Sequence, residues 1–169
     1  MPRVPPKLES RKNIDVRVNN YETEDPMLAN NDITAMIAVR DLARARKFYE
    51  EVLGLTPASP ESPEVQVYQS GNGKLAVYVS DYAGTNKATA VTWEVGDVES
   101  VVADLKSHGV RFEHYDMPAT IRQGDVHVSG PIKNAWFKDP DGNILSLINK
   151  MDVSQTKSSN PADRATANR

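Results

Sequence analysis

Residues 38–55 read AVRDLARARKFYEEVLGL, and this stretch decides the fold of the chain. An apolar run ends at Val39, and Asp41 then stands where its side chain can accept a hydrogen bond from a free N–H group at a helix N-terminus. Apolar residues follow at helical spacing, and Gly54 suits the left-handed position that ends many helices. The stretch therefore predicts a strand that ends at Val39, followed by an amphipathic helix.

The same pattern recurs in the second half of the chain. Asp97 repeats Asp41 at an offset of 56 residues, and Gly109 repeats Gly54 at an offset of 55 residues. A nearly constant offset between two similar segments indicates an internal duplication. The sequence therefore predicts two units built to one plan.

Strand and turn signals follow each predicted helix. Asn72-Gly73 is a hairpin signal because both residues tolerate positive φ, and the sequence DPDG at 139–142 suits a type I turn. In the second unit a long polar loop is expected from Asp116 to about Pro131, before the strands that flank the DPDG turn. Each unit is therefore predicted as one strand, one helix and three further strands, β-α-β-β-β. The predicted boundaries are 1–30 for a flexible polar arm, 31–82 and 87–150 for the two modules of one domain at 31–150, and 151–169 for a disordered tail.

Three stretches together resemble one protein family. Residues 38–55, residues 94–112 (EVGDVESVVADLKSHGVRF) and residues 136–147 (WFKDPDGNILSL) are similar to the module openings and the closing hairpin of the glyoxalase/bleomycin resistance protein/extradiol dioxygenase superfamily, the vicinal oxygen chelate proteins. The resemblance implies an α+β fold in which tandem βαβββ modules form a curved mixed sheet around a cavity. It also implies a homodimer, and it leaves open whether the modules pair within one chain or between two chains.

The resemblance further implies a divalent metal, held by His or Gln on the first strand and Glu on the last strand of the modules. The expected positions hold Thr34 and Ala90 on the first strands and Ser146 on the last, while the strand 74–80 contains no carboxylate. A metal needs side chains with lone pairs that converge in space. We therefore expect no cofactor, and a divalent metal only at relocated ligands. Such a relocated site would consist of His114, Asp116 and His127.

Side chains alternate across a strand, so the expected metal positions also define the face that lines the cavity. Thr34 places Met36 on this face, and Ala90 places Thr92 and Glu94 there. Aromatic side chains and methionine are typical of sites for flat organic ligands. Glu94 and His114 are weak candidates for catalytic proton transfer. The full predicted lining of the ligand cavity is Thr34, Met36, Tyr68, Tyr78, Thr92, Glu94, Tyr115, Met117, Trp136 and Ser146.

Composition narrows the classes of function. The chain has 169 residues, a formal net charge of −3 and no cysteine, which excludes disulfides, thiolate nucleophiles and cysteine metal clusters. The acidic balance argues against a nucleic-acid partner. No apolar run approaches the roughly 18 residues of a membrane span, and the first residues do not form a secretory signal. We therefore expect a cytoplasmic protein that binds neither nucleic acid nor membrane.

Three functions stay open at this point. The first is a metal-free protein that binds a small apolar or aromatic molecule in the inter-module cavity, as bleomycin-resistance proteins sequester their ligand. The second is a glyoxalase-family enzyme of the lyase, isomerase or dioxygenase type, with relocated metal ligands or with metal-free acid and base residues. The third is a dimeric interaction module, because Ile14–Val18 alternates apolar and polar residues and suits an added strand.

Overall fold

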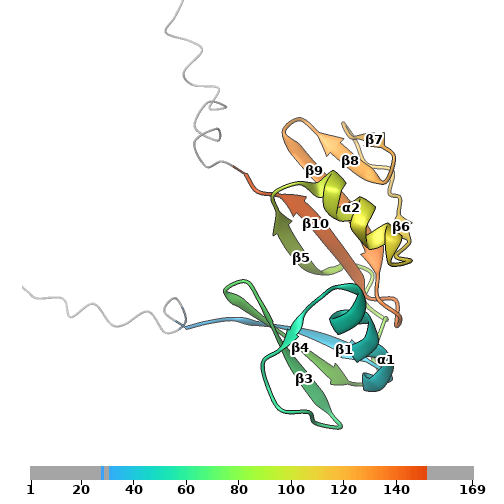
Figure 1. Cartoon of the computed structure of the whole chain (residues 1–169). Helices are drawn as coiled ribbons and strands as arrows, with labels where there is room; N and C mark the ends of the chain where they lie inside the picture. Colours follow the sequence, from blue (N-terminus) through green and yellow to red (C-terminus); the bar gives the residue numbers. More distant parts are fainter. Residues whose placement is uncertain (1–27, 29–30, 152–169) are drawn as a thin grey trace, which may run out of the picture. The chain divides into compact units, whose positions relative to one another are not determined.

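The structure, a computed structural model, describes Leu28 and residues 31–151. Apart from Leu28 and Met151, the predicted arm and tail lie outside the described residues, and so does the segment Ile14–Val18. From Asp32 onward the described residues belong to one compact unit. This unit contains two mixed sheets, and a helical segment packs on one face of each sheet (Figure 1).

The first module forms a four-stranded sheet in the order β1-β4-β3-β2. Its strands β1 and β4 are parallel, and the other two pairings are antiparallel. The predicted helix begins as an α-helix and continues as a π-helical segment, η1. The elements are β1 (Thr34–Val39), α1 (Leu42–Arg46), η1 (Lys47–Val52), β2 (Thr56–Pro57), β3 (Val65–Ser70) and β4 (Gly73–Val79).

The second module repeats this plan and adds strands. Its sheet has the order β5-β10-β9-β8-β7, with β6 paired to β9, and β5 is parallel to β10 as β1 is to β4. The elements are β5 (Thr89–Val95), α2 (Val98–Ser107), β6 (Phe112–Glu113), β7 (Ile121–Gln123), β8 (Val126–Ser129), β9 (Ile132–Lys138) and β10 (Ile144–Asn149). The repeated parallel pair confirms the predicted α+β class with two modules.

The helix boundaries follow the capping residues read from the sequence. The side chains of Asp41 and Asp97 each accept a hydrogen bond from the backbone N–H three residues later, at 3.0 and 3.2 Å. Gly54 and Gly109 follow the two helices with φ of 68° and 85°. Both predicted N-caps and both predicted C-terminal glycines are therefore confirmed.

Two local predictions need correction. The first hairpin turns at Gly71 and Asn72, because Gly73 already pairs with Ser70 in the ladder. The segment from Asp116 to Pro131 is not one loop: residues 121–129 form the β7–β8 hairpin. The strand β7 is only three residues long, and the alternation of Val126 and Val128 in the four-residue β8 is too short to mark a strand on its own.

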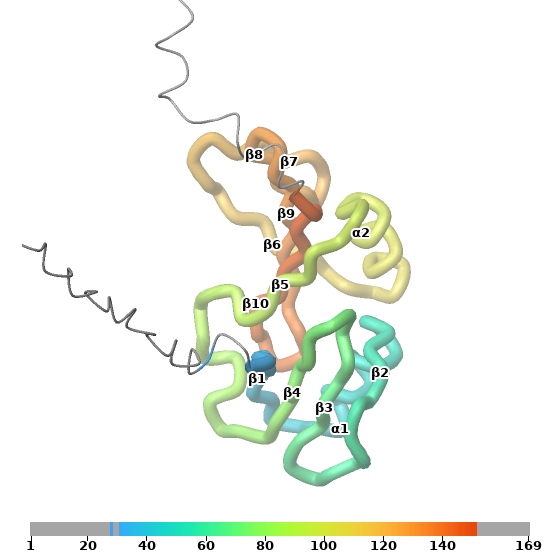
Figure 2. Tube along the Cα trace, turned by 90° about the vertical axis from the view of Figure 1, so that its left-hand side faces the viewer, coloured from blue at the N-terminus to red at the C-terminus, as the bar shows by residue number. Residues whose placement is uncertain are grey.

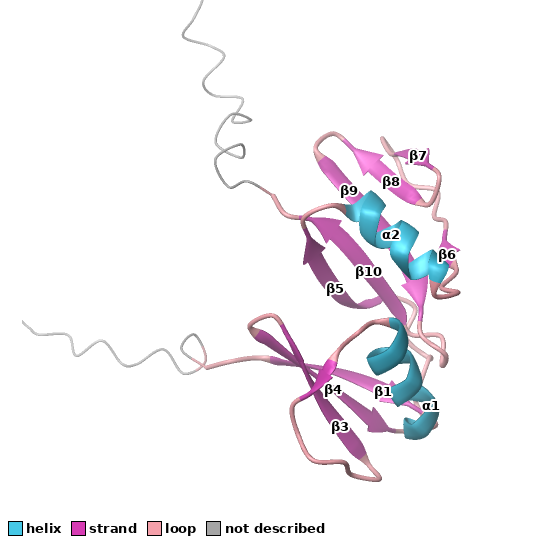
Figure 3. Cartoon of the chain, viewed as in Figure 1, coloured by secondary structure: helices cyan, strands magenta, loops and turns pink. Residues whose placement is uncertain are grey.

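The helix-facing sides of both sheets share one apolar core. Tyr49 and Tyr68 from the first module and Phe137 from the second are fully buried in it. Trp93 stacks on Phe137 with ring centroids 6.5 Å apart. Figure 2 shows the same elements turned by 90°, and Figure 3 shows one helical segment beside each sheet. Among the described residues no helix is both long and apolar enough to cross a membrane.

The turn DPDGN, residues 139–143, connects the second module to the first. The predicted tight turn is confirmed by the bond from Gly142 N–H to the Asp139 carbonyl oxygen, at 3.0 Å. The Asp139 carboxylate accepts a hydrogen bond from the Tyr49 hydroxyl, at 2.9 Å, and Asn143 donates to the Ala38 carbonyl oxygen, at 2.8 Å. The DPDGN turn therefore fixes the start of β10 against β1 and η1.

Candidate functional site

The face of the second sheet that does not contact α2 carries most of the predicted site, and we call it the second open face. Strand register places two rows of paired residues across it. One row is Arg122, His127, Asn134, Ile148 and Glu94, and the other is Glu113, Trp136, Ser146 and Thr92. The register therefore brings four predicted residues, Thr92, Glu94, Trp136 and Ser146, onto one surface.

A pair of hydroxyl groups lies at the centre of this face. Thr92 Oγ1 and Ser146 Oγ are 2.7 Å apart, so one donates a hydrogen bond to the other. Ser146 is buried, whereas Thr92 is exposed at the edge strand β5. Trp136 is paired directly with Ser146 and donates from Nε1 to Thr89 Oγ1, at 3.2 Å. This part of the face presents an indole ring beside two small polar groups.

An aromatic cluster continues from Trp136 toward the β7–β8 hairpin. The ring centroids of Tyr115 and His127 lie 5.6 and 5.1 Å from that of Trp136, both in edge-on geometry. His127 is buried, and its Nε2 accepts a hydrogen bond from the Tyr115 backbone N–H, at 3.1 Å. Burial, followed by the charges of His114 and Arg122, lowers the pKa of His127. The imidazole is therefore neutral at pH 7, with Nε2 as acceptor.

A pocket of about 360 Å³ opens beside this cluster, and we call it the hairpin pocket. It is lined by Tyr115, Asp116, Met117, Thr120, Arg122 and His127. Tyr115 and Met117 belong to the predicted lining, whereas Arg122 was not selected from the sequence. In the sequence Arg122 was only one basic residue in a predicted polar loop. It becomes a candidate site residue because β7 pairs it with His127.

The first sheet has an equivalent first open face, which carries Thr34, Met36 and Tyr78. The register pairs Met36 with Ala76 and Ala38 with Tyr78, so these predicted residues share one side of the sheet. Thr34 and Met36 are open to solvent, with Met36 57% exposed, whereas Tyr78 is half-buried. A face with an exposed methionine and little charge is suited to being covered by another surface.

Tyr68 does not belong to this face, and its predicted position is corrected. Its register partner is Leu75, which lies in the helix-side core, so Tyr68 faces η1. It is fully buried, stacks on Tyr49 at 5.9 Å and donates from its hydroxyl to Glu50, at 3.0 Å. Burial, and then the bond to Glu50, raise the pKa of Tyr68 above its ordinary value. Tyr68 is therefore a core residue.

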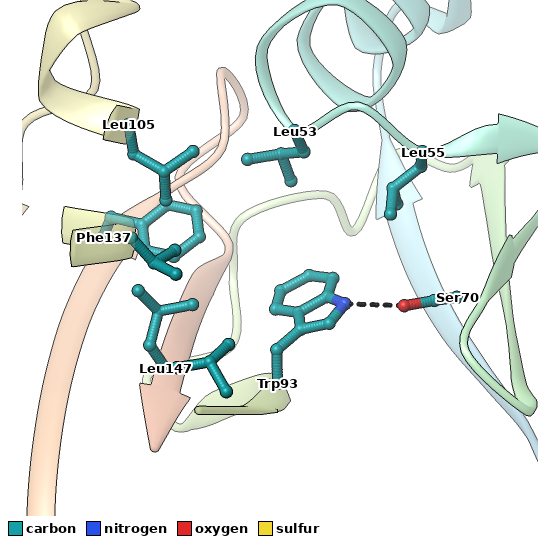
Figure 4. Close-up of a pocket in the computed structure, with 9 residues that line it drawn as sticks. Leu53, Leu55, Ser70, Trp93, Leu105, Phe137 and Leu147 are labelled. Carbon is teal, nitrogen blue, oxygen red and sulfur yellow. Dashed lines mark hydrogen bonds between the residues drawn. The ribbon is translucent and has the colours of Figure 1, made fainter. Parts of the chain in front are cut away.

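The junction between the modules contains two further hollows. One, of about 590 Å³, is lined from both modules and includes Lys74, Thr92 and Glu94. The other, of about 180 Å³, lies on the helix side among leucines and Phe137. There Trp93 Nε1 donates to Ser70 Oγ, at 2.9 Å, across the junction (Figure 4). Trp93 thus packs behind the sheet, as alternation along β5 predicts.

The two weak catalytic candidates are not brought together. Glu94 is exposed on β5, whereas His114 follows β6, with β10 and β9 between the two strands. His114 Nε2 lies 2.8 Å from Asp125 Oδ1, and Asp125 also pairs with Lys106, at 2.5 Å. The hydrogen bonds from Lys106 and His114 lower the pKa of Asp125. This cluster therefore serves to hold the β7–β8 hairpin against the end of α2.

A family model described as the Glyoxalase/Bleomycin resistance protein/Dioxygenase superfamily matches residues 33–147. The chain belongs to this superfamily. The match includes both modules, in agreement with the paired strands and capped helices described above. Because a superfamily of this kind hosts several chemistries, membership establishes the fold but not the activity.

Solved structures of this superfamily share the fold. A bleomycin resistance determinant encoded on the transposon Tn5 has 20% identity and a TM-score of 0.56, over 72% of this chain and 99% of that one. A lactoylglutathione lyase from Agrobacterium tumefaciens has 15% identity and a TM-score of 0.53, over 71% and 93%. TnmS3, an antibiotic binding protein from Streptomyces sp. CB03234, has 19% identity and a TM-score of 0.51, over 75% and 100%.

The residues at the superfamily's metal positions do not fit a divalent metal. Thr34 and Ala90 are on the first strands, and Ser146 offers one hydroxyl that is already bonded to Thr92. The counterpart of Ser146 in the first sheet is Ala76, which pairs with Met36 as Ser146 pairs with Thr92. These positions supply no imidazole and no carboxylate, which are the usual donors for such ions.

The relocated ligand set is not assembled either. His127 Nε2 accepts the Tyr115 N–H, and His114 Nε2 is engaged by Asp125. Asp116 lines the hairpin pocket with His127, but His114 does not. Within residues 31–151 no group of three or more His, Asp or Glu residues is placed to hold a metal ion.

Proposed function

We propose that this protein binds a small, largely apolar or aromatic molecule on the second open face, without a metal ion. The observation that carries the proposal is the row of Trp136, Ser146 and Thr92, where an indole ring and two mutually bonded hydroxyls occupy the centre of the site. A flat aromatic surface beside a few fixed polar groups is the usual composition of a small-molecule site. Binding requires affinity but no catalytic group.

The similar structures support binding as a function of this fold. They include a bleomycin resistance determinant and an antibiotic binding protein, while the lactoylglutathione lyase is a precedent for the enzyme alternative. Because the metal positions carry no imidazole and no carboxylate, the binding proteins are the better precedent for this chain. An organic ligand of moderate size, such as an antibiotic, is therefore the class of molecule that we propose.

We further propose that the second open face is covered by the first open face of a second copy of the chain. Both faces are open on the single chain, and a two-fold axis would pair each with its complement, which closes two equal cavities. The exposed Met36 would then meet an apolar surface instead of water. In this arrangement each cavity is formed by one module from each of two chains.

The dimer gives a direct test on the first open face. Met36→Asp should convert the protein to a monomer, because an unpaired carboxylate in a covered apolar interface is strongly unfavourable. Light scattering after size exclusion should give twice the chain mass for the original protein and the chain mass for the variant. The control is Val79→Asp. Val79 is also exposed and lies on β4, but its side chain points to the other face of the first sheet. A monomeric original protein would refute the dimer.

Binding is tested by tryptophan fluorescence, because the chain has two tryptophans on opposite faces of the second sheet. We expect bleomycin, 2-naphthoate or 2-naphthamide to quench the original protein and the Trp93→Phe variant. The Trp136→Phe variant should lose the quenching and about two- to tenfold in affinity, since phenylalanine presents a smaller ring and an aromatic pair contributes about 0.5–1.5 kcal/mol. Circular dichroism confirms that both variants fold.

The opposite pattern would contradict the proposed site. If Trp93→Phe abolished quenching and Trp136→Phe kept it, the ligand would occupy the junction between the modules. If no probe bound, or if purified protein contained a stoichiometric transition metal, metal-free binding would be wrong.

A further inference from the structure

The hairpin pocket adjoins the second open face through one shared residue. His127 lines the pocket and also belongs to the row that crosses the face, and its ring contacts Trp136. A molecule that lies against Trp136 therefore reaches the pocket with one end. The polar character of the pocket then decides which chemical group that end carries.

Arg122 differs from three lysines of the same module. Lys106, Lys133 and Lys138 each make an ion pair with a carboxylate, at 2.5, 2.6 and 2.8 Å. The guanidinium of Arg122 has no hydrogen bond or ion pair within the described part of the chain, although it lines the pocket beside Asp116. A guanidinium presents a planar fork of donors that matches a carboxylate or a phosphate in bidentate geometry.

Buried polar atoms without partners lie around the same position. The hydroxyl of Tyr115, Nδ1 of His127 and Oδ1 of Asn134 are shielded from solvent and have no hydrogen-bond partner among the described residues. His127 is 3% exposed, so water does not compensate it from outside. Buried groups of this kind are rare in native proteins and call for an explanation. A bound carboxylate accepts hydrogen bonds and so supplies a partner for the Tyr115 hydroxyl and for the Nδ1–H of His127, whereas Oδ1 of Asn134 is an acceptor outside the hairpin pocket and needs a donor instead.

We propose that the molecule bound on the second open face carries a carboxylate or a similar planar anion, which Arg122 and the Tyr115 hydroxyl bind in the hairpin pocket. This inference rests on the proposed function and specifies its ligand as an acidic aromatic compound. Asp116 opposes the anion in the same pocket, so its charge lowers the affinity that Arg122 provides.

The matched probes are 2-naphthoate and 2-naphthamide, which share one ring system and differ in charge. The full chain should bind the naphthoate about tenfold or more tightly than the naphthamide in isothermal titration calorimetry. Arg122→Gln should remove most of this preference and leave the naphthamide affinity within about twofold, because the lost contact is specific for the anion. Asp116→Asn should increase the naphthoate affinity.

The control variant is Arg111→Gln, which removes the same charge from a residue outside the hairpin pocket. It should leave the preference for naphthoate unchanged. If the naphthamide binds as well as the naphthoate, or if Arg122→Gln weakens both probes alike, this inference fails while the proposed function stands. If neither probe binds, both fail together.

Discussion

Replacing Asp139 by alanine is expected to lower the free energy of unfolding by about 3–5 kcal/mol. The carboxylate is buried and satisfies four donors. Its Oδ1 accepts the backbone N–H groups of Asp141 and Asn143, at 3.0 and 2.8 Å. Its Oδ2 accepts the Tyr49 hydroxyl and the Asn143 side-chain amide, at 2.9 and 2.7 Å. Alanine leaves all four donors without their partner.

The Tyr49 bond is the part of this network that joins the two modules. Burial, and then the neighbouring Asp139 carboxylate, raise the pKa of Tyr49 well above its ordinary value, so the hydroxyl is protonated and donates at neutral pH. Tyr49→Phe removes this donor alone and should cost about 1.5–3 kcal/mol. In a double-mutant cycle, the effects of Tyr49→Phe and Asp139→Ala should not add, because both remove the same bond.

Urea unfolding followed by circular dichroism measures both variants. Asp81→Ala is the matched control, since Asp81 is an exposed aspartate in the segment between β4 and β5, and its loss should stay within about 0.5 kcal/mol. A loss below about 1 kcal/mol for Asp139→Ala would show that the DPDGN turn does not depend on the carboxylate.

The sequence predicted the DPDGN turn but not its partners, and the reason is physical. A tight turn is encoded locally, by a proline and a glycine at fixed positions. The bond to Tyr49 joins residues 90 positions apart, and Tyr49 appeared in the sequence only as part of an apolar helical stripe. The capped helices were predictable on the same local grounds, because an N-cap and a C-terminal glycine act within one turn of a helix.

The direction of the side chains in the candidate site could also be predicted only in part from the sequence. Alternation placed Met36, Thr92 and Ser146 on the open faces, because each position was counted along a strand from a family position. Tyr68 was misplaced because no such reference existed on β3, and its direction depends on the register with β4. Arg122 was missed because a three-residue strand carries no periodic signal.

The most damaging glycine substitution is expected in the segment that links the modules. Gly84 has φ of 68°, and a Cβ built on it would lie 1.9 Å from the Asp141 carbonyl oxygen. Gly84→Ala combines an unfavourable backbone conformation with a collision against backbone that cannot rotate away. We expect a loss of about 4 kcal/mol or more in the free energy of unfolding.

Gly54→Ala separates these two causes. Gly54 has the same φ of 68°, but a Cβ there would have no atom within 4 Å. Its replacement should therefore cost only the conformational term, about 1–2 kcal/mol. The difference between the two losses measures the close approach of the linker to the DPDGN turn, and equal losses would show that the approach is absent.

The collision also predicts how the damage spreads. Gly84 N–H donates to Asn143 Oδ1, at 3.3 Å, and Asp141 pairs with Arg44, at 2.6 Å. A displaced turn would weaken both contacts, together with the bonds at Asp139. In an Asp139→Ala background the turn is already free to move, so Gly84→Ala should cost less there than alone. Full additivity of the two losses would mean that linker and carboxylate hold the modules independently.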